Sequence, residues 1–289
     1  MTNDLSRTVL GSALGLFLLM GTAACDSGSE TGDTGGSGGS GGAETTGGSG
    51  GTDPTGGTGG TPTTGGGGAG GAPSGEFAVL VRGPLFTDDL AAAKEKHDGI
   101  AMGGESQAKE AGDIAHHVFL GTSLLGTSQD EFTAMDRWTD ATAMHAFYQD
   151  PQIQAAFGQL FSAPPVIEAF QRRPEWHTWG DITLTNGADP YYWVVVRGHL
   201  AESDPAKAQS AHDMVAAGGE DTVKGAGDIA HIVFTGLEDP QQFLAVDIWK
   251  STDNLEAVYT NPDFQQAFGA LFDAPPTLGV YQSTDWHQW

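Results

Sequence analysis

The chain has 289 residues and a formal net charge of −25, from 37 acidic and 12 basic side chains. A charge this negative repels nucleic acid and anionic lipid headgroups, so we expect no nucleic-acid partner. The single cysteine excludes an intrachain disulfide and leaves packing as the source of stability.

Residues 1–25 are predicted to be a bacterial lipoprotein signal peptide. The apolar run 9–20 is too short for a permanent membrane span and fits the hydrophobic part of a signal peptide. Small residues lead to Cys25, an arrangement that resembles a lipobox, although Thr22 stands where that motif usually has Leu. We expect export to the bacterial cell envelope and a lipid-bilayer anchor at Cys25. Cleavage at Ala24 as a plain signal peptide is the alternative.

Residues 26–75 consist mostly of Gly, Ser and Thr and contain almost no large apolar side chain. Such a segment cannot offset the entropy of ordering, so we predict a disordered tether. A flexible coil of this length has a root-mean-square reach of roughly 35–42 Å. It would hold a folded domain away from a membrane.

The remainder is one unit in two copies, predicted as 76–180 and 190–289. The first parts of the two copies align without a gap at a spacing of 115 residues, and beyond a short loop difference the later parts align at slightly shorter spacings. The strongest matches pair residues 112–119 with 227–234, residues 151–165 with 262–276, and the ends Trp-His-Thr-Trp (176–179) with Trp-His-Gln-Trp (286–289). A repeat of this kind indicates two structurally equivalent halves.

Each half is predicted to be a ferredoxin-like βαββαβ unit, which makes the fold class α+β. In the first half the pattern predicts, in chain order, a strand at 77–81, a helix from Asp88 that ends before Gly103, a hairpin of strands 114–120 and 132–138, a helix at 141–161 broken near Pro151, and a strand at 166–172. One such sheet leaves a face uncovered. We therefore expect the two sheets to pack face to face in an intramolecular barrel, and the chain to be a monomer.

The sequence resembles the antibiotic biosynthesis monooxygenase-like group of dimeric α/β barrels. The resemblance lies in residues 136–140 (Asp-Arg-Trp-Thr-Asp), 144–148 (Met-His-Ala-Phe-Tyr) and 150–153 (Asp-Pro-Gln-Ile), and in their counterparts 247–251, 255–259 and 261–264. It implies the barrel fold, and with it cofactor-free oxygenases of quinol-like aromatics or haem-degrading enzymes.

The chain departs from that group at the positions that carry its known activities. Tyr148 and Tyr259 stand where the helix often has His, and Gln152 and Asp263 stand where a second His often follows the proline. The strand Asn of the haem degraders has no counterpart in residues 79–82. The resemblance therefore supports the fold and does not carry an activity over.

Two histidine–aspartate pairs are the catalytic candidates. Strand alternation and the hairpin register predict that His116 lies beside Asp136, and His231 beside Asp247. We expect both pairs to face the barrel interior. A carboxylate beside an imidazole is the orienter–base arrangement that proton transfer needs. A structural polar pair is the alternative, since buried polar groups must be paired whatever the function.

Ligand-binding candidates follow from two pairs of large side chains. Trp138 and Trp249 could stack on a flat ligand, with a core role as the alternative. Arg82 and Arg197 could bind an anionic substrate, with structural ion pairs as the alternative. We find no zinc-ligand spacing and predict no metal.

Three further histidine-containing motifs are interpreted without a catalytic role. His97-Asp98 and His212-Asp213 should lie near the end of the first helix of each copy, where a histidine charge suits the helix C-terminus. Asp113 and His116, three residues apart, should point to opposite sides of a strand and so make a poor metal pair. The Trp-His-x-Trp ends should plug the barrel.

Taken together, these patterns suggest a membrane-anchored oxygenase that acts on a small aromatic compound without a bound cofactor. The alternatives are binding of an aromatic ligand or haem without turnover, and a purely structural barrel. A cavity of ligand size that contains His116 or His231 would favour the first two.

Overall fold

The computed structural model describes residues 75–182 and 191–289, all of which belong to one compact unit, Thr64–Trp289. The predicted signal peptide, its Cys25 and almost all of the predicted tether lie outside the described residues. Within the described ranges, no helix is both long and apolar enough to cross a membrane.

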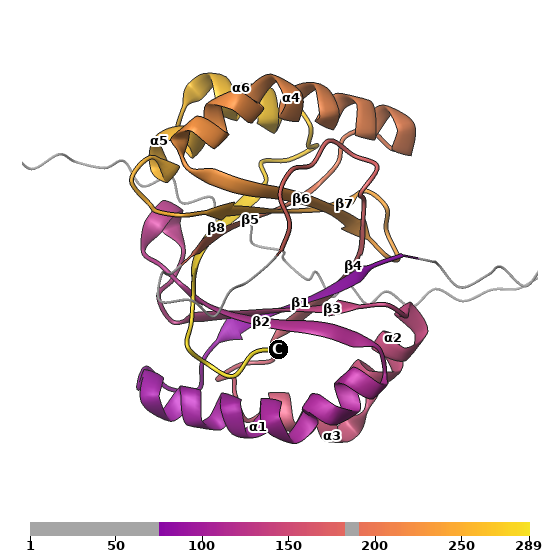
Figure 1. The fold of residues 1–289 in the computed structure, drawn as a ribbon, viewed down its shortest axis with the longest axis vertical. Coiled ribbons are helices and arrows are strands. Elements are labelled where there is room, and N and C mark those ends of the chain that lie inside the picture. The colour runs from indigo at the N-terminus through magenta and orange to yellow at the C-terminus, as the bar shows by residue number, and fades with distance from the viewer. Residues whose placement is uncertain (1–74, 183–190) are drawn as a thin grey trace, which may run out of the picture. The chain divides into compact units, whose positions relative to one another are not determined.

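The first repeat begins at β1 and ends at β4 (Figure 1). Its elements are, in chain order, β1 (Phe77–Pro84), α1 (Leu90–Glu110), β2 (Asp113–Gly121), the short 3-10 helix η1 (Leu124–Gly126), β3 (Glu131–Trp138), α2 (Ala141–Gln149), α3 (Pro151–Phe157) and β4 (Val166–Arg172).

The second repeat has the same order of strands and main helices. Its elements are β5 (Tyr192–His199), α4 (Pro205–Ala226), β6 (Asp228–Gly236), β7 (Gln242–Trp249), α5 (Leu255–Tyr259), α6 (Pro262–Gly269) and β8 (Thr277–Ser283).

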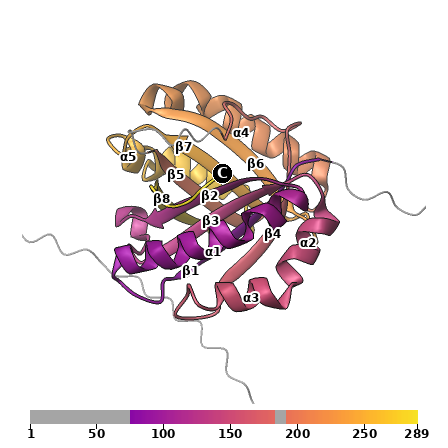
Figure 2. The same ribbon diagram turned by 60° about the horizontal axis from the view of Figure 1, so that its bottom comes forward.

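The eight strands form one closed barrel in the order β1-β3-β2-β8-β5-β7-β6-β4. Each repeat contributes an antiparallel four-stranded sheet, and the sheets join where β2 pairs with β8 and β4 pairs with β6. Helices α1–α3 cover the outer face of the first sheet, and α4–α6 cover the outer face of the second (Figures 1 and 2). The structure confirms the α+β barrel built from two ferredoxin-like repeats.

The barrel interior is packed with side chains from both repeats. Leu80, Met135, Trp193, Val246 and Tyr281 belong to this cluster, which contains no helix residue. The rings of Phe119 and Trp193 lie 3.9 Å apart between centroids. The interior is therefore a hydrophobic core, and two apolar sheet faces buried against each other supply much of the driving force for closure.

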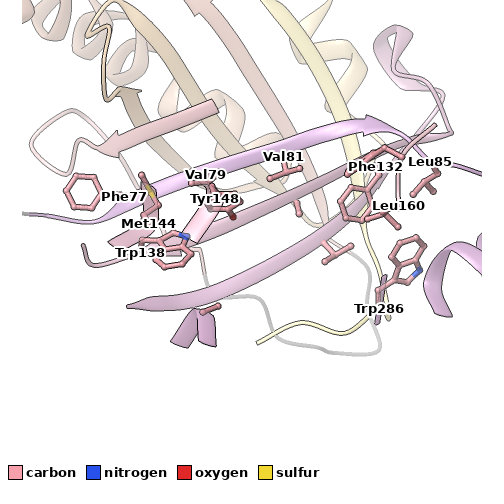
Figure 3. Packing of buried hydrophobic residues seen from close by; sticks show 14 of the residues in the cluster. Phe77, Val79, Val81, Leu85, Phe132, Trp138, Met144, Tyr148, Leu160 and Trp286 are labelled. Carbon is pink, nitrogen blue, oxygen red and sulfur yellow. The ribbon is translucent and has the colours of Figure 1, made fainter. Parts of the chain in front are cut away.

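A second layer of core lies between each sheet and its helices. In the first repeat Val79 and Trp138 on the strands pack against Ala93 of α1 and Met144 of α2. Figure 3 shows part of this cluster, including Trp286, which comes from the far end of the chain. Both faces of each sheet thus carry a cluster of buried apolar side chains.

Local sequence explains where the helices begin and break. Asp89 caps α1 because its carboxylate accepts hydrogen bonds from the backbone N–H groups of Ala91 and Ala92. Asp150 ends α2 and caps α3. Pro151 occupies the first turn of α3, where the backbone N–H that proline lacks would have no partner within the helix. The helix break near Pro151 is thereby confirmed.

The predicted end of the first helix is wrong. Helix α1 continues through Gly103 and Gly104 to Glu110, two turns beyond the prediction. Glycine inside a helix costs roughly 1 kcal/mol relative to alanine, so tertiary packing must outweigh that preference here. Gly104 lies on the face of α1 that lines a cavity, together with Ala101 and Ala108.

Candidate active site

Both predicted histidine–aspartate pairs are in contact across β-strands. His116 on β2 is the register partner of Asp136 on β3, and its Nδ1 contacts Asp136 Oδ1. In the second repeat His231 Nδ1 lies 2.5 Å from Asp247 Oδ1. All four side chains are buried. The pairing follows directly from antiparallel register, which brings opposite side chains on one face within reach.

The prediction that these pairs face the barrel interior is wrong. They lie on the outer face of each sheet, beneath the helices, because Leu244, Val246 and Ile248 on the opposite face of β7 fill the barrel. Strand alternation sorts residues into two faces but does not say which face is which. His117, on the other face of β2 from His116, is the histidine that points into the barrel, beside Trp193.

A second histidine extends each pair. His97 of α1 places its Nε2 3.2 Å from Nε2 of His116, and its Nδ1 lies 3.0 Å from Asp98 Oδ1. The two rings are parallel within 9°. His97 is buried in the interior of α1 (Leu90–Glu110), so the prediction that it lies near a helix end is wrong. In the second repeat the same contacts measure 3.1 Å and 3.0 Å, between His212 and His231 and between His212 and Asp213.

Tyrosine from the second helix completes the row. The hydroxyl of Tyr148 donates to Asp136 Oδ2, and that of Tyr259 donates to Asp247 Oδ2 at 2.5 Å. Burial and then the neighbouring carboxylate raise the pKa of both tyrosines well above the ordinary value, so they remain neutral donors. Each repeat thus holds one continuous row of hydrogen-bonding groups, Asp98–His97–His116–Asp136–Tyr148 in the first.

The geometry of the row fixes how many protons it needs. Each of the three contacts from Asp98 to Asp136 joins two atoms with lone pairs, so each requires one proton, whereas two neutral imidazoles bring only two. A neutral imidazole pair therefore leaves one of the three contacts without a proton. Burial and then the charge of His116 lower the pKa of His97 to about 4, so His97 is neutral near neutral pH.

The outer carboxylate of the row is held ionised. Burial raises the pKa of Asp98, but hydrogen bonds from the backbone N–H of His287 and from Lys94 outweigh that effect and lower it. An ionised Asp98 accepts the ring proton of His97, so the contact without a proton lies in the inner part of the row, between the two imidazoles and Asp136.

A third carboxyl group reaches the same site through a β-bulge. The pairing of β2 with β3 shifts register between Asp113 and Ala115, so that both Asp113 and His116 line one cavity. The prediction that they point to opposite sides of the strand is wrong for this reason. Burial and then the charge of Asp136 raise the pKa of Asp113 to about 8. Asp228 in the second repeat has the same position and the same raised pKa, about 8.

Each site is covered by the end of the other repeat. Trp289 stacks on His116, with ring centroids 4.6 Å apart and an angle of 28°, and accepts a backbone hydrogen bond from it at 2.9 Å. Trp179, which follows β4, stacks on His231 at 4.7 Å and 30°. The cause is the barrel: β8 pairs with β2 and β4 pairs with β6, so each end runs on over the opposite repeat (Figure 1).

The Trp-His-x-Trp ends therefore do not plug the barrel as predicted. They lie on the helix side of the sheet, where the ring of Trp286 is 5.2 Å from that of His97. His287 also places its Nε2 2.9 Å from a Glu105 carboxylate oxygen on α1. At the first end Gly180 has φ +68°, and an added Cβ would lie 2.3 Å from the Ile229 carbonyl oxygen, so the close crossing over β6 requires glycine.

A cavity lies beside each row, between the sheet and the helices. Both cavities open to solvent, and their volumes are about 60 Å³ in the first repeat and about 40 Å³ in the second. His97, His116, Asp113 and Asp136 are the polar groups of the first cavity, and the other lining residues are almost all apolar. A few convergent polar groups in an apolar cavity are typical of a small-molecule site.

The four ligand-binding candidates lie elsewhere. Trp138 and Trp249 are fully buried in the helix–sheet cores, where Trp138 packs against Phe147, and neither lines the two cavities. Arg82 and Arg197 form ion pairs with one carboxylate of Glu168 at 3.4 Å and 3.5 Å. The structure therefore gives all four a structural position.

No group of three or more metal-ligating side chains is placed to hold a metal ion among residues 75–182 and 191–289. The sequence matches no protein-family pattern, and no curated protein is similar to it.

Solved structures share the fold. An anthrone oxidase-like protein is 18% identical with a TM-score of 0.53, over 74% of this chain and 92% of that one. A candidate monooxygenase from Fusobacterium nucleatum subsp. nucleatum is 10% identical with a TM-score of 0.52, over 73% of this chain and 93% of that one. These likenesses confirm a monooxygenase-like α/β-barrel fold.

Proposed function

From a fold shared with monooxygenase-like α/β barrels, we propose that this chain is a cofactor-independent oxygenase of small aromatic compounds, held at a bacterial membrane by lipidated Cys25. The observation that carries the proposal is the buried row of proton-binding groups beside an apolar cavity, present in both repeats. The anthrone oxidase-like neighbour suggests the chemical class of substrate, a polycyclic aromatic with an acidic C–H bond.

The imidazole pair is the proposed base. In its neutral form, His97 and His116 oppose two nitrogen lone pairs at 3.2 Å, and a proton accepted between them relieves that repulsion. Asp136 holds Nδ1 of His116 and thereby fixes the orientation of the ring. The apolar walls of the cavity disfavour a charge on any other part of it. The imidazole pair is therefore the group that best accepts a proton from the substrate.

Asp113 is the proposed acid. With its pKa raised to about 8, it is largely protonated at neutral pH and can donate a proton to an anion that forms in the cavity. The site thus offers a proton acceptor and a proton donor at the same pH, because burial and neighbouring charge separate their pKa values.

The proposed reaction balances without an added reductant. The base removes a proton from a CH₂ carbon, the carbanion passes one electron to O₂, and the two radicals form a C–O bond. The resulting peroxide anion takes a proton from the acid. Loss of the second C–H proton with cleavage of the O–O bond gives a ketone and water, so that R₂CH₂ + O₂ yields R₂C=O + H₂O. All four electrons come from the substrate.

Oxygen uptake by the full mature chain with anthrone tests the proposal. We expect one O₂ per anthrone, and a loss of roughly 10²- to 10⁴-fold when His116→Phe and His231→Phe are combined, since a general base contributes about that much. Circular dichroism checks that the variant folds, and Lys207→Ala, on the exposed start of α4, is the control. Anthrone oxidation at the uncatalysed rate, or full activity in the double variant, would refute the proposal.

Ligand binding without turnover is the second candidate, favoured by the apolar cavities themselves. Haem is a poor fit for it. An iron ligand needs a free imidazole nitrogen, whereas both nitrogens of His97 and of His116 have partners at hydrogen-bonding distance. Absence of a Soret band together with saturable binding of anthrone would favour an aromatic ligand.

A further inference from the structure

The ring protons of the imidazole pair can be arranged in two ways. With the proton of His116 on Nδ1, against Asp136, its Nε2 keeps a lone pair. If His97 also carries its proton on Nδ1, two lone pairs oppose each other at 3.2 Å, and the pair can accept a proton from outside. If His97 carries its proton on Nε2, it donates to His116 and the contact is satisfied. The tautomer of His97 therefore decides whether the pair is a base.

Asp98 is the group that holds the proton of His97 on Nδ1. Its Oδ1 lies 3.0 Å from Nδ1 of His97. An ionised carboxylate is a stronger hydrogen-bond acceptor than the neutral imidazole of His116, so Nδ1 is the preferred place for the proton. Without the carboxylate, repulsion between the two facing lone pairs would drive the proton to Nε2, and the pair would no longer accept a proton from a substrate.

The Asp98 carboxylate is itself held by a segment from the other repeat. This segment, residues 284–289 after β8, is the strap of the second repeat. The same Oδ1 that faces the imidazole accepts from the backbone N–H of His287 at 2.7 Å. Lys94 lies 2.7 Å from Oδ2 and also donates to the backbone oxygen of Asp285 at 2.8 Å. The Asp98 side chain is 18% exposed, so these contacts keep it turned toward the imidazole instead of toward water.

The strap is anchored along the strand that carries His116. Val118 donates its backbone N–H to the side-chain oxygen of Gln288 at 3.1 Å. His116 and Trp289 exchange two backbone hydrogen bonds, at 2.9 Å and 3.3 Å. The N–H that reaches Asp98 therefore comes from a segment whose position is set by pairing with β2.

The second repeat keeps this arrangement and changes one part of it. Asp213 Oδ1 lies 3.0 Å from Nδ1 of His212. It also accepts, at 2.7 Å, from the backbone N–H of His177, which belongs to the strap of the first repeat, residues 174–179. Gln209 stands where the first repeat has a lysine, and its Nε2 lies 3.5 Å from Asp213 Oδ2. The two repeats therefore share the oxygen that joins ring and strap, and they do not share the cation.

We propose that Asp98 and Asp213 are positioning residues for the base, and that each holds the active tautomer only while the strap of the other repeat is docked against it. Release of a strap frees the carboxylate, moves the ring proton of the neighbouring histidine from Nδ1 to Nε2, and switches that base off. The role of the imidazole pair as a base rests on the proposed function, whereas its tautomer is measured without turnover.

Proton–nitrogen correlation spectra of the full mature chain read the tautomers directly, because protonated and unprotonated ring nitrogens have well-separated shifts. We expect the proton on Nδ1 of both His97 and His212 in the wild-type chain. Asp98→Ala should move the proton of His97 to Nε2 and leave His212 unchanged, and Asp213→Ala should do the reverse. The unchanged histidine shows that each variant folds. A wild-type His97 protonated on Nε2, or a tautomer that Asp98→Ala does not change, would overturn the proposal.

Removal of the backbone donor tests the part played by the strap. His287→Pro removes the N–H that reaches Asp98 and should move the proton of His97 toward Nε2, with His212 unchanged. Lys94→Gln is the matched control: it introduces the residue of the second repeat, so it should leave both tautomers as they are. A His97 tautomer that ignores His287→Pro, or that switches with Lys94→Gln, would refute the coupling to the strap.

Activity separates the positioning role from the proposed function. Asp98→Ala combined with Asp213→Ala should lower kcat for anthrone by about 10²-fold or more and change KM by less than about threefold, since an imidazole in the wrong tautomer cannot accept the proton. A tautomer switch in a chain that takes up no oxygen would support the positioning role and refute the oxygenase. Oxygen uptake with both tautomers unchanged in the combined variant would refute the positioning role and leave the oxygenase standing.

Discussion

Removal of the Asp247 carboxylate is the sharpest test of the buried row. This carboxylate accepts from the ring of His231 and from the hydroxyl of Tyr259, and all three side chains are buried. Asp247→Ala leaves two donors without an acceptor, and each such group costs about 1–3 kcal/mol. The free energy of unfolding should therefore fall by about 2–6 kcal/mol. The substitution also removes the Asp247 charge, which helps to raise the pKa of Asp228, and the end of this repulsion offsets part of the loss.

Urea unfolding followed by tryptophan fluorescence measures this loss. Adding Tyr259→Phe to the Asp247→Ala variant removes one stranded donor, so the double variant should be more stable than Asp247→Ala alone by about 1–3 kcal/mol. Asp221→Ala, on the exposed face of α4, should change the free energy by less than about 0.5 kcal/mol. Additive losses for Asp247→Ala and Tyr259→Phe would refute a shared carboxylate, as would a loss below about 1 kcal/mol for Asp247→Ala.

Three further outcomes are expected. Because burial lowers the pKa of His97 and of His212 from 6.5 to about 4, the unfolded chain binds more protons between those values, so the unfolding temperature should fall as pH drops from about 6.5 to about 4, and less steeply in a His97→Phe variant. A slope unchanged by His97→Phe would contradict this. Trp289→Ala should shift the ring signals of His116 and leave those of His231 in place, whereas an effect confined to the second repeat would contradict the position of Trp289 over the site of the first repeat. A palmitate analogue should label the wild-type chain in cells and not Cys25→Ser, and equal labelling of both would refute the lipid anchor.

The fold was accessible from sequence because two independent signals agree. The duplication requires two equivalent halves, and one half exposes a sheet face that only another sheet of the same shape can cover. The strand at Val166–Arg172 and the break at Pro151 were predicted from local residues alone. The end of α1 was not, because Gly103 and Gly104 disfavour a helix locally while tertiary packing carries it to Glu110.

The site was predictable only in part. Antiparallel register places His116 opposite Asp136 whichever face is buried, so the pair itself follows from sequence. Its face does not follow, because both sheet faces are apolar. The place of His97 in the site was not predicted, because the first helix was expected to end soon after it. The available signal was its spacing to Ala101, Gly104 and Ala108, which puts all four residues on one side of a helix.

The sequence contains no local sign of which site each Trp-His-x-Trp end covers. That assignment depends on the pairing of β8 with β2 and of β4 with β6, which forms only when the whole barrel is closed. Contacts between residues so far apart in the chain are the kind that local patterns do not encode. The raised pKa of Asp113 was likewise unpredictable, because it depends on a bulge that brings the carboxyl into the cavity.

Because the end of each repeat covers the site of the other repeat, the two copies cannot change independently. A substitution at Trp179 acts on the row that contains His231, and a substitution at Trp289 acts on the row that contains His116. A substitution in the end of one copy is selected by its effect on the site of the other copy. The cavity walls contributed by α3 and α6 are under no such joint control, which leaves them as the places where the two copies can acquire separate roles.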